Sequence, residues 1–350
     1  MERILIIKTG ALGDVLRSTS LLGGIHSRWP GAEVTWVTAH GAEPLVQGHP
    51  EVQRVFALDP KDCAGAAAEL SALKPDRILS LDDDPELCAL AANVQQQTQA
   101  VLAGACLDSE GQPAYTDDGE CWFGMGLLSR DGLQRADERK LANRRTHPDL
   151  LAQVIGVLPG RPALHLSDGD LGIGAEVLDR EVPRSKGLRI GLNTGAGGRW
   201  RTKAMRPAEV ADLVARLASR LGSTAVQFLI LGGTDETERN QELLELSRAA
   251  APAAQLIDPG CDHSLGTFAA MVGGLDLLVT SDSLALHMAV AQGCKTVAFF
   301  APTSPHEIEL YGLGEKVIST APDAGNYARD TDNSTITGER VAGAVLRQLN

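Results

Sequence analysis

Short apolar segments alternate with amphipathic segments along most of the chain. Residues 4–8 form a mainly apolar run, and a glycine turn, TGALGD, separates this run from a helix-like stretch that begins at Val15. The same order continues through the first half: the next predicted strands are 33–38, 54–58, 77–81 and 100–105, and the next helices are 63–73 and one that begins at Pro85. Strands and helices that alternate at this length predict an α/β fold with a doubly wound parallel sheet.

This order starts again near residue 189. A strand is expected at 189–194, followed by a second glycine turn at 195–198 and a helix at 207–221, in which apolar residues recur every three or four positions. Pro207 suits the first turn of that helix and Gly222 suits the position after its end. The remaining strands are expected at 227–233, 254–258, 276–282 and 296–302, with helices that reach about Ala250, begin at Ser264 and cover 283–292.

A chain of 350 residues is expected to form two domains. We place a Rossmann-like N-terminal domain at 1–165, a linker at 166–185 and a Rossmann-like C-terminal domain at 186–350. Both halves open with a strand, Thr-Gly-Ala and a helix, so two similar sheets that face one another across a ligand cleft are expected. Residues 138–158 are expected to be helical, with a basic patch at 139–145. Packing of the C-terminal helix against the N-terminal domain is left open.

Charge and composition exclude several classes of protein. The chain has 32 Lys and Arg against 45 Asp and Glu, a net charge of −13, which argues against a general nucleic-acid binder. No apolar run is long enough for a membrane span. The N-terminus reaches Asp14 and Arg17 too soon for a signal peptide, so a cytoplasmic location is expected. The six cysteines include no CxxC pair, so neither a zinc site nor a disulfide framework is indicated.

The first glycine turn is the first candidate site. It follows the first strand at its carboxyl end, where open α/β sheets bind ligands. Gly10 and Gly13 allow a close backbone approach, and Asp14 falls at the helix start; spacing alone favours Asp14 as an N-cap or a first-turn acid of that helix. The turn matches neither GxGxxG nor the P-loop pattern, which argues against a dehydrogenase and a P-loop NTPase.

The second glycine turn is followed by a basic cluster in an otherwise acidic chain. The cluster consists of Arg199, Arg201, Lys203 and Arg206. Backbone N–H groups of a glycine loop together with Lys or Arg side chains suit a diphosphate. A solvated basic face is the alternative interpretation.

Two further segments carry acidic or ionisable residues at strand ends. In TSDSLALH, at 280–287, a helix start beside Asp282 and Ser283 suits a leaving diphosphate, and His287 offers another donor; the alternative is that Asp282 caps the helix and His287 only packs. In LDDDP, at 81–85, Asp82 and Asp84 match a metal-binding Asp-x-Asp pattern. Their position before Pro85 instead predicts a cluster of helix-capping acids, so no metal is expected.

Taken in order, these segments resemble the heptosyltransferases of glycosyltransferase family 9, two-domain GT-B enzymes of lipopolysaccharide core assembly. The resemblance covers nearly the whole chain. It rests on ILIIKTGALGDVLRSTSLL at 4–22, GAGGRWRTKAMRP at 195–207, LGGTDE at 231–236, VTSDSLALHMAVAQG at 279–293 and FFAPTSP at 299–305.

The resemblance implies roles for individual residues. Asp14 matches the family's general base, with Gly13 beside it, and Lys8 matches a lysine near the acceptor. Lys203 matches the diphosphate-binding lysine and Glu236 an acid that holds the ribose. Further donor-site residues are Thr194, Gly195, Arg199, His263, Asp282, Ser283 and His287. We take Asp14, Lys203 and His287 as catalytic. The chain departs from the family pattern at Ser283, where the family has Thr, and at Leu284, where it has Gly, which leaves the donor sugar open.

The expected activity is inverting, metal-independent and cofactor-free transfer of a sugar, heptose from an ADP-linked donor, to a hydroxyl of a lipopolysaccharide core or another glycan. The N-terminal domain would bind the acceptor and the C-terminal domain the nucleotide sugar. A lipid-linked acceptor would bring peripheral contact with the inner membrane. Two alternatives stay open: a sugar-nucleotide epimerase or hydrolase on the same fold, and a catalytically silent sugar-nucleotide-binding protein.

Overall fold

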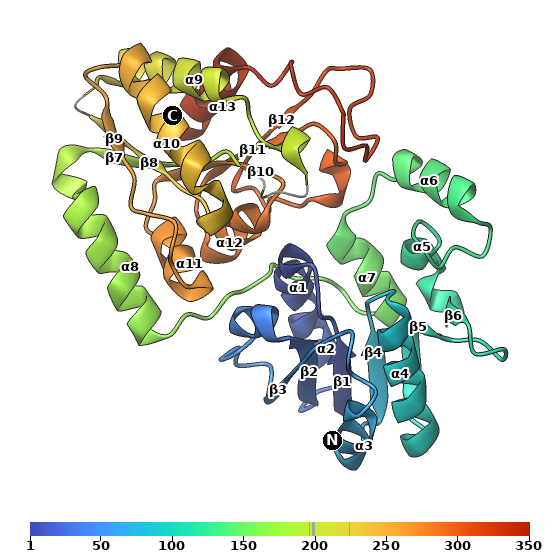
Figure 1. Ribbon diagram of the computed structural model, residues 1–350. Coiled ribbons are helices and arrows are strands. Elements are labelled where there is room, and N and C mark those ends of the chain that lie inside the picture. Colours follow the sequence, from blue (N-terminus) through green and yellow to red (C-terminus); the bar gives the residue numbers. More distant parts are fainter. Residues whose placement is uncertain (196, 198–199, 224) are drawn as a thin grey trace. The chain divides into compact units, whose positions relative to one another are not determined.

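The structure, a computed structural model, describes residues 1–195, 197, 200–223 and 225–350. The chain forms two compact units, Met1–His165 and Leu166–Asn350. In each unit, helices surround a six-stranded sheet (Figure 1).

The first unit contains a mainly parallel sheet. Its strands are β1 (Arg3–Ile7), β2 (Glu33–Ala39), β3 (Arg54–Leu58), β4 (Arg77–Ser80), β5 (Val101–Leu107) and β6 (Pro113–Tyr115), in the order β3-β2-β1-β4-β5-β6. Only β6, which the sequence did not predict, pairs in the antiparallel direction. Residues Ile4 to Ile7 are at most 1% exposed, as expected for a central parallel strand covered on both faces.

The helices of the first unit are α1 (Leu12–Ser18), α2 (Leu22–Arg28), α3 (Ala66–Ala72), α4 (Pro85–Thr98), α5 (Glu120–Phe123), α6 (Leu133–Ala142) and α7 (His147–Ile155). The prediction of one helix over 138–158 is wrong, because α6 ends at Ala142 and α7 begins at His147. Thr146 caps α7 by accepting a hydrogen bond from the backbone of Asp149, and Pro148 occupies its first turn. A cap followed by a proline is a helix-start signal.

The second unit repeats this topology. Its strands are β7 (Leu188–Asn193), β8 (Val226–Ile230), β9 (Gln255–Ile257), β10 (Leu277–Ser281), β11 (Thr296–Phe300) and β12 (Gly314–Ile318), in the order β12-β11-β10-β7-β8-β9. All the pairs between these strands are parallel. Starting from β9, the order is the same as in the first sheet. Both are doubly wound sheets, so the predicted fold class is confirmed.

The helices of the second unit are α8 (Asp168–Glu181), α9 (Pro207–Leu221), α10 (Thr237–Ala250), α11 (Leu265–Gly273), α12 (Leu284–Gln292) and α13 (Gly338–Leu349). The bounds of α9 match the sequence expectation. The segment expected as a linker instead contains α8, which packs on α11. Its glycines lower helix propensity, but Gly174 lets α8 approach Ala270 closely. Helix α13 packs against α9, β11 and β12 of its own unit.

Gly104, in β5, occupies a position that a larger residue does not fit. Its φ is +99°, and a Cβ atom there would lie 2.0 Å from the carbonyl oxygen of Ser80. We expect Gly104→Ala to lower the free energy of unfolding by roughly 1–3 kcal/mol, as measured in urea. Gly23→Ala is the control, because Gly23 lies in helix α2 with open space around it and alanine favours a helix by about 1 kcal/mol. Equal stability of Gly104→Ala and the wild type would contradict the steric argument.

Candidate active site

In each sheet the strand order reverses beside the first strand of the unit, between β1 and β4 and between β7 and β10. Loops that leave two neighbouring parallel strands there diverge to opposite faces, and ligands bind in the crevice that results. The candidate residues follow these four strands. Lys8 follows β1, Asp82 lies beyond β4, Thr194 follows β7 and Asp282 follows β10.

The first unit holds a buried cluster at this position. The ammonium of Lys8 lies 2.5 Å from Oδ1 of Asp82, and both side chains are about 5% exposed. The other carboxylate oxygen, Oδ2, accepts hydrogen bonds from the backbone N–H of Thr9 at 2.5 Å and from its hydroxyl at 2.8 Å. Burial by itself lowers the pKa of Lys8, but the negative charges of Asp82 and Asp14 outweigh it and the pKa is raised. Lys8 is therefore a charged, buried partner of Asp82.

The acids at 82–84 differ from their prediction as helix-capping residues. Asp84 occupies the N-cap position of α4, but its side chain makes no capping hydrogen bond, and Asp82 binds Lys8. Lys8 comes directly after β1 and Asp82 comes two residues after the end of β4, and the parallel pairing of these two strands brings the residues together.

Asp14 lies in the first turn of α1, with its side chain 32% exposed. The N-cap of α1 is Ala11, so Asp14 is not the cap of this helix but an acid of its first turn, which is one of the two alternatives that spacing allowed. Its carboxylate lies 2.7 Å from the guanidinium of Arg17, one turn further along, whose side chain is only 11% exposed. Gly13 precedes Asp14 within the same turn. Arg17 was not predicted as a partner of Asp14, although the i, i+3 spacing of the two residues is a signal for such a pair.

The second unit brings three predicted residues together. The ammonium of Lys203 lies 2.9 Å from Oδ2 of Asp282 and donates a further hydrogen bond to the backbone oxygen of Asp282 at 3.0 Å. Nε2 of His287 lies 4.0 Å from Oδ1 of Asp282. All three side chains are 10–16% exposed. The N-cap position of α12 is Ser283, the residue directly after Asp282.

Two more predicted residues connect the glycine loop to its surroundings. The carbonyl of Gly195 accepts a hydrogen bond from the hydroxyl of Ser281 at 2.9 Å. The carboxylate of Glu236 accepts hydrogen bonds from the backbone N–H of Gly197 at 3.3 Å and of Gly233 at 3.1 Å. The acid expected to hold a ribose thus contacts the backbone of two glycine turns.

Arg239 of α10 contacts both ends of the second glycine loop. This residue was not predicted from the sequence. One guanidinium nitrogen, Nη2, donates to the carbonyl and hydroxyl of Thr194 at 3.0 and 3.2 Å and to the carbonyl of Met205 at 2.6 Å. The backbone N–H of Met205 also donates to the carbonyl of Thr194. Burial lowers the pKa of Arg239. Arg239 therefore joins the two ends of the segment 194–205.

The remaining predicted residues have separate positions. Ser283 lies within hydrogen-bond distance of Thr280 and Asn193. His263, in the loop after β9, has its Nε2 atom 3.1 Å from the carbonyl of Pro259. Arg199 lies outside the described residues. These contacts place Ser283 at the start of α12 and leave the roles of His263 and Arg199 as predictions.

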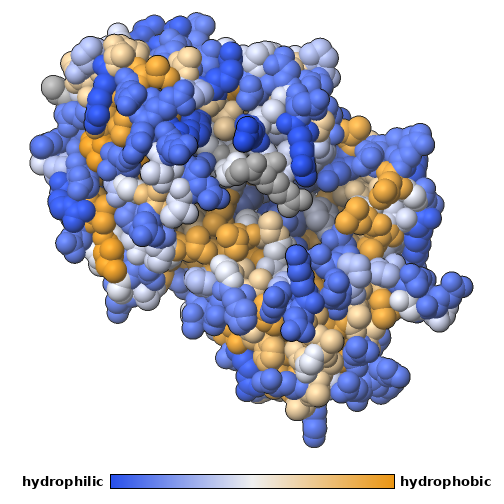
Figure 2. Space-filling view, viewed as in Figure 1, coloured by the Kyte–Doolittle hydropathy of each residue, from blue (hydrophilic) through white to orange (hydrophobic). Residues whose placement is uncertain are grey.

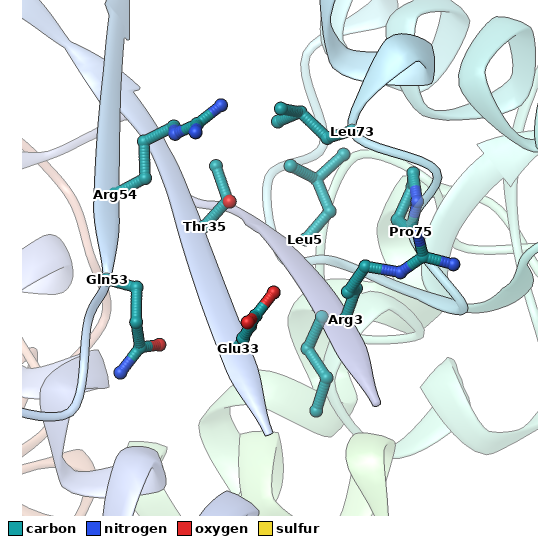
Figure 3. A pocket seen from close by; sticks show the side chains of 9 residues that line it. Arg3, Leu5, Glu33, Thr35, Gln53, Arg54, Leu73 and Pro75 are labelled. Carbon is teal, nitrogen blue, oxygen red and sulfur yellow. The ribbon is translucent and has the colours of Figure 1, made fainter. Parts of the chain in front are cut away.

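Two cavities help to place the site. One, of about 890 Å³, lies beside the second glycine loop and is lined by Gly197, Arg201, Glu236 and Arg239, among others. The other, of about 320 Å³, lies at the amino ends of β1, β2 and β3 and is lined by Arg3, Glu33 and Arg54 (Figure 3). Because ligands of doubly wound sheets bind at the carboxyl edge, the cavity in Figure 3 is not the candidate site.

Comparison with known proteins shows which family the chain resembles. Residues 212–334, which include Glu236, Asp282 and His287, match the model of glycosyltransferase family 9 (heptosyltransferase). The resemblance to glycosyltransferase family 9 is confirmed. The chain is also 25% identical over 331 residues to lipopolysaccharide heptosyltransferase 1 of Pseudomonas aeruginosa, an alignment that covers 89% of this chain and 82% of that relative.

Solved structures of family 9 proteins share the fold. The family 9 glycosyl transferase from Veillonella parvula superposes with a TM-score of 0.76 at 19% identity, over 99% of this chain and 97% of the other. The ADP-heptose lps heptosyltransferase II of Escherichia coli superposes with a TM-score of 0.65 at 18% identity, over 100% and 98% of the two chains. The GT-B fold class expected from the family 9 resemblance is thereby confirmed.

Substitution of Lys203 tests the expected diphosphate contact directly. We expect Lys203→Ala to weaken ADP binding, measured by calorimetry, by about 10- to 100-fold, the range for loss of a hydrogen bond to a charged group. Arg220→Ala, in the last turn of α9, is the control for loss of one positive charge on this unit. If Lys203→Ala and Arg220→Ala both bind ADP as the wild type does, Lys203 serves only as the partner of Asp282.

His287 is expected to act on the transition state. A donor to developing negative charge matters most there, so His287→Ala should reduce transfer more than it reduces ADP affinity. Asp282→Ala should lower both. Melting temperature, ADP affinity and transfer rate are measured for each variant. A loss of melting temperature alone, with the other two unchanged, would remove this segment from the site.

Proposed function

We propose that the chain is an inverting, metal-independent glycosyltransferase that moves heptose from ADP-heptose to a hydroxyl of a lipopolysaccharide core. The observation that carries the proposal is the Lys203, Asp282 and His287 cluster at the switch point of the second sheet, two members of which lie within the family 9 match. The names of two similar proteins, a lipopolysaccharide heptosyltransferase and an ADP-heptose lps heptosyltransferase, support the donor and the acceptor class.

The second unit would bind the nucleotide sugar. The ammonium of Lys203 and the N-terminus of α12 both offer positive charge, which is what a departing diphosphate requires. His287 would donate a further hydrogen bond to this leaving group. The carboxylate of Glu236 would give up its hydrogen bond from the N–H of Gly197 and would instead accept hydrogen bonds from the ribose hydroxyls. With this arrangement, the charge of the diphosphate is balanced by protein groups without a metal ion.

The first unit would bind the acceptor. Asp14 is partly exposed at the carboxyl edge of the first sheet, so its carboxylate is accessible to a hydroxyl group. As the new bond to the anomeric carbon forms, Asp14 would take the proton of that hydroxyl. The ion pair with Arg17 would fix the orientation of the Asp14 carboxylate. Attack on the face opposite the leaving diphosphate inverts the configuration at the anomeric carbon.

Peripheral membrane contact would fit a lipid-linked acceptor. In the described residues, the structure has no helix with the length and apolar character to cross a bilayer. Helix α6 exposes Leu133 and Leu141, and the exposed Arg144 and Arg145 follow it; Figure 2 shows apolar residues on this part of the surface. Arg139 of the expected basic patch instead forms ion pairs with Glu120 and Asp131. The exposed leucines and arginines suit an anionic lipid surface.

Transfer is tested with the purified protein, ADP-heptose and a heptose-deficient core acceptor. We expect Asp14→Asn to keep its ADP affinity and melting temperature while turnover falls by roughly two to four orders of magnitude. EDTA should leave wild-type transfer unchanged. Asp83→Asn, a neutralisation elsewhere in the same unit, is the control.

Three results would overturn this proposal. Turnover of ADP-heptose without an acceptor would favour a hydrolase or epimerase. Donor binding without turnover would favour a silent binding protein. A strict divalent-metal requirement would contradict the assignment of charge balance to Lys203 and α12.

A further inference from the structure

The carboxylate of Asp82 uses both oxygens inside the protein. Oδ1 binds the ammonium of Lys8, and Oδ2 accepts from the backbone and the hydroxyl of Thr9. The residue is only 5% exposed. With three short contacts and so little exposed surface, Asp82 faces the turn after β1 and not a substrate.

The turn itself is held from both neighbouring strands. On one side, the N–H of Lys8 donates to the carbonyl of Val37, and the indole of Trp36 donates to the carbonyl of Lys8 at 3.2 Å. On the other side, Asp82 binds the next residue, Thr9. Three residues later the chain enters α1, the helix that carries Asp14.

We propose that Asp82 is a positioning residue for the acceptor half of the site, because its carboxylate fixes the turn from which α1 and Asp14 project. This inference rests on the proposed function for its consequence in catalysis, but the fixing of the turn stands independently. Lys8 supplies the positive charge that keeps a buried carboxylate favourable. Asp82 thus acts through Thr9 and α1 and does not touch the reacting atoms.

The first test separates positioning from donor binding. In Asp82→Asn, the amide cannot accept at both positions, and the buried ammonium of Lys8 loses its counter-charge. We expect kcat to fall by about 10- to 100-fold, the loss that follows a displacement of about 1 Å of a reacting group, while the KM for the donor and the affinity for ADP change less than twofold. Asp83→Asn, at the adjacent half-buried position, should match the wild type.

A second pair of variants keeps the test valid if Asp82→Asn folds poorly. Lys8→Met/Asp82→Asn and Lys8→Met/Asp82→Leu both remove the two buried charges, and they differ in whether an acceptor for Thr9 remains. Amide hydrogen exchange at Thr9, Asp14 and Val15 is the readout, because it reports local opening without any substrate. We expect the asparagine variant to retain slow exchange and the leucine variant to exchange at least tenfold faster at these amides.

The two readouts distinguish the possible failures. Equal exchange in the two double variants would overturn the positioning role, whether or not the protein transfers a sugar. Faster exchange in the leucine variant, with a wild type inactive toward every donor and acceptor tried, would overturn the proposed function and support the fixing of the turn by Asp82. An Asp82→Asn variant with wild-type kcat would also overturn the inference.

Discussion

Parallel pairing of the first strand of each unit with two neighbours determines where this protein can carry chemistry. Parallel strands have their carboxyl ends at one edge, and only beside β1 and β7 does the strand order reverse. Loops of opposite direction leave the sheet there, so residues distant in sequence meet. Lys8 meets Asp82 across 74 positions, and Lys203 meets Asp282 across 79. The candidate residues are a product of topology as much as of local sequence.

Both units therefore place a lysine against an aspartate at the switch point, with different consequences. The Lys8 pair is about 5% exposed, and loss of one partner from such a buried pair costs about 3–5 kcal/mol. The Lys203 pair is about 15% exposed and borders a helix start. A diphosphate bound there would compete with the carboxylate for the ammonium. One pair is suited to hold a turn and the other to bind a ligand.

Alternation of apolar strands and amphipathic helices predicted the first five strands of each sheet and, in the case of α9, the bounds of a helix, but it did not predict the edge strands β6 and β12. Prediction failed where local preferences were weak. Helix α8 was not predicted because its glycines have low helix propensity. The single helix expected at 138–158 is two helices, because Thr146 caps the start of α7. At the site, the segment 280–287 suggested Asp282 and His287, and the basic cluster after the second glycine turn separately suggested Lys203. Spacing could not predict the partners Asp82 and Arg239, since strand order alone brings the first to Lys8 and helix packing alone brings the second to Thr194.

Arg239 has a consequence for how the second glycine loop can change over evolution. Its guanidinium and one backbone hydrogen bond connect Thr194 to Met205, so the two ends of the segment between them are held close together. Insertions or replacements inside the segment then need not disturb β7 or α9. Replacements that spare Gly195, Gly197 and Lys203, which contact Ser281, Glu236 and Asp282, can then accumulate inside the segment while the scaffold is inherited unchanged.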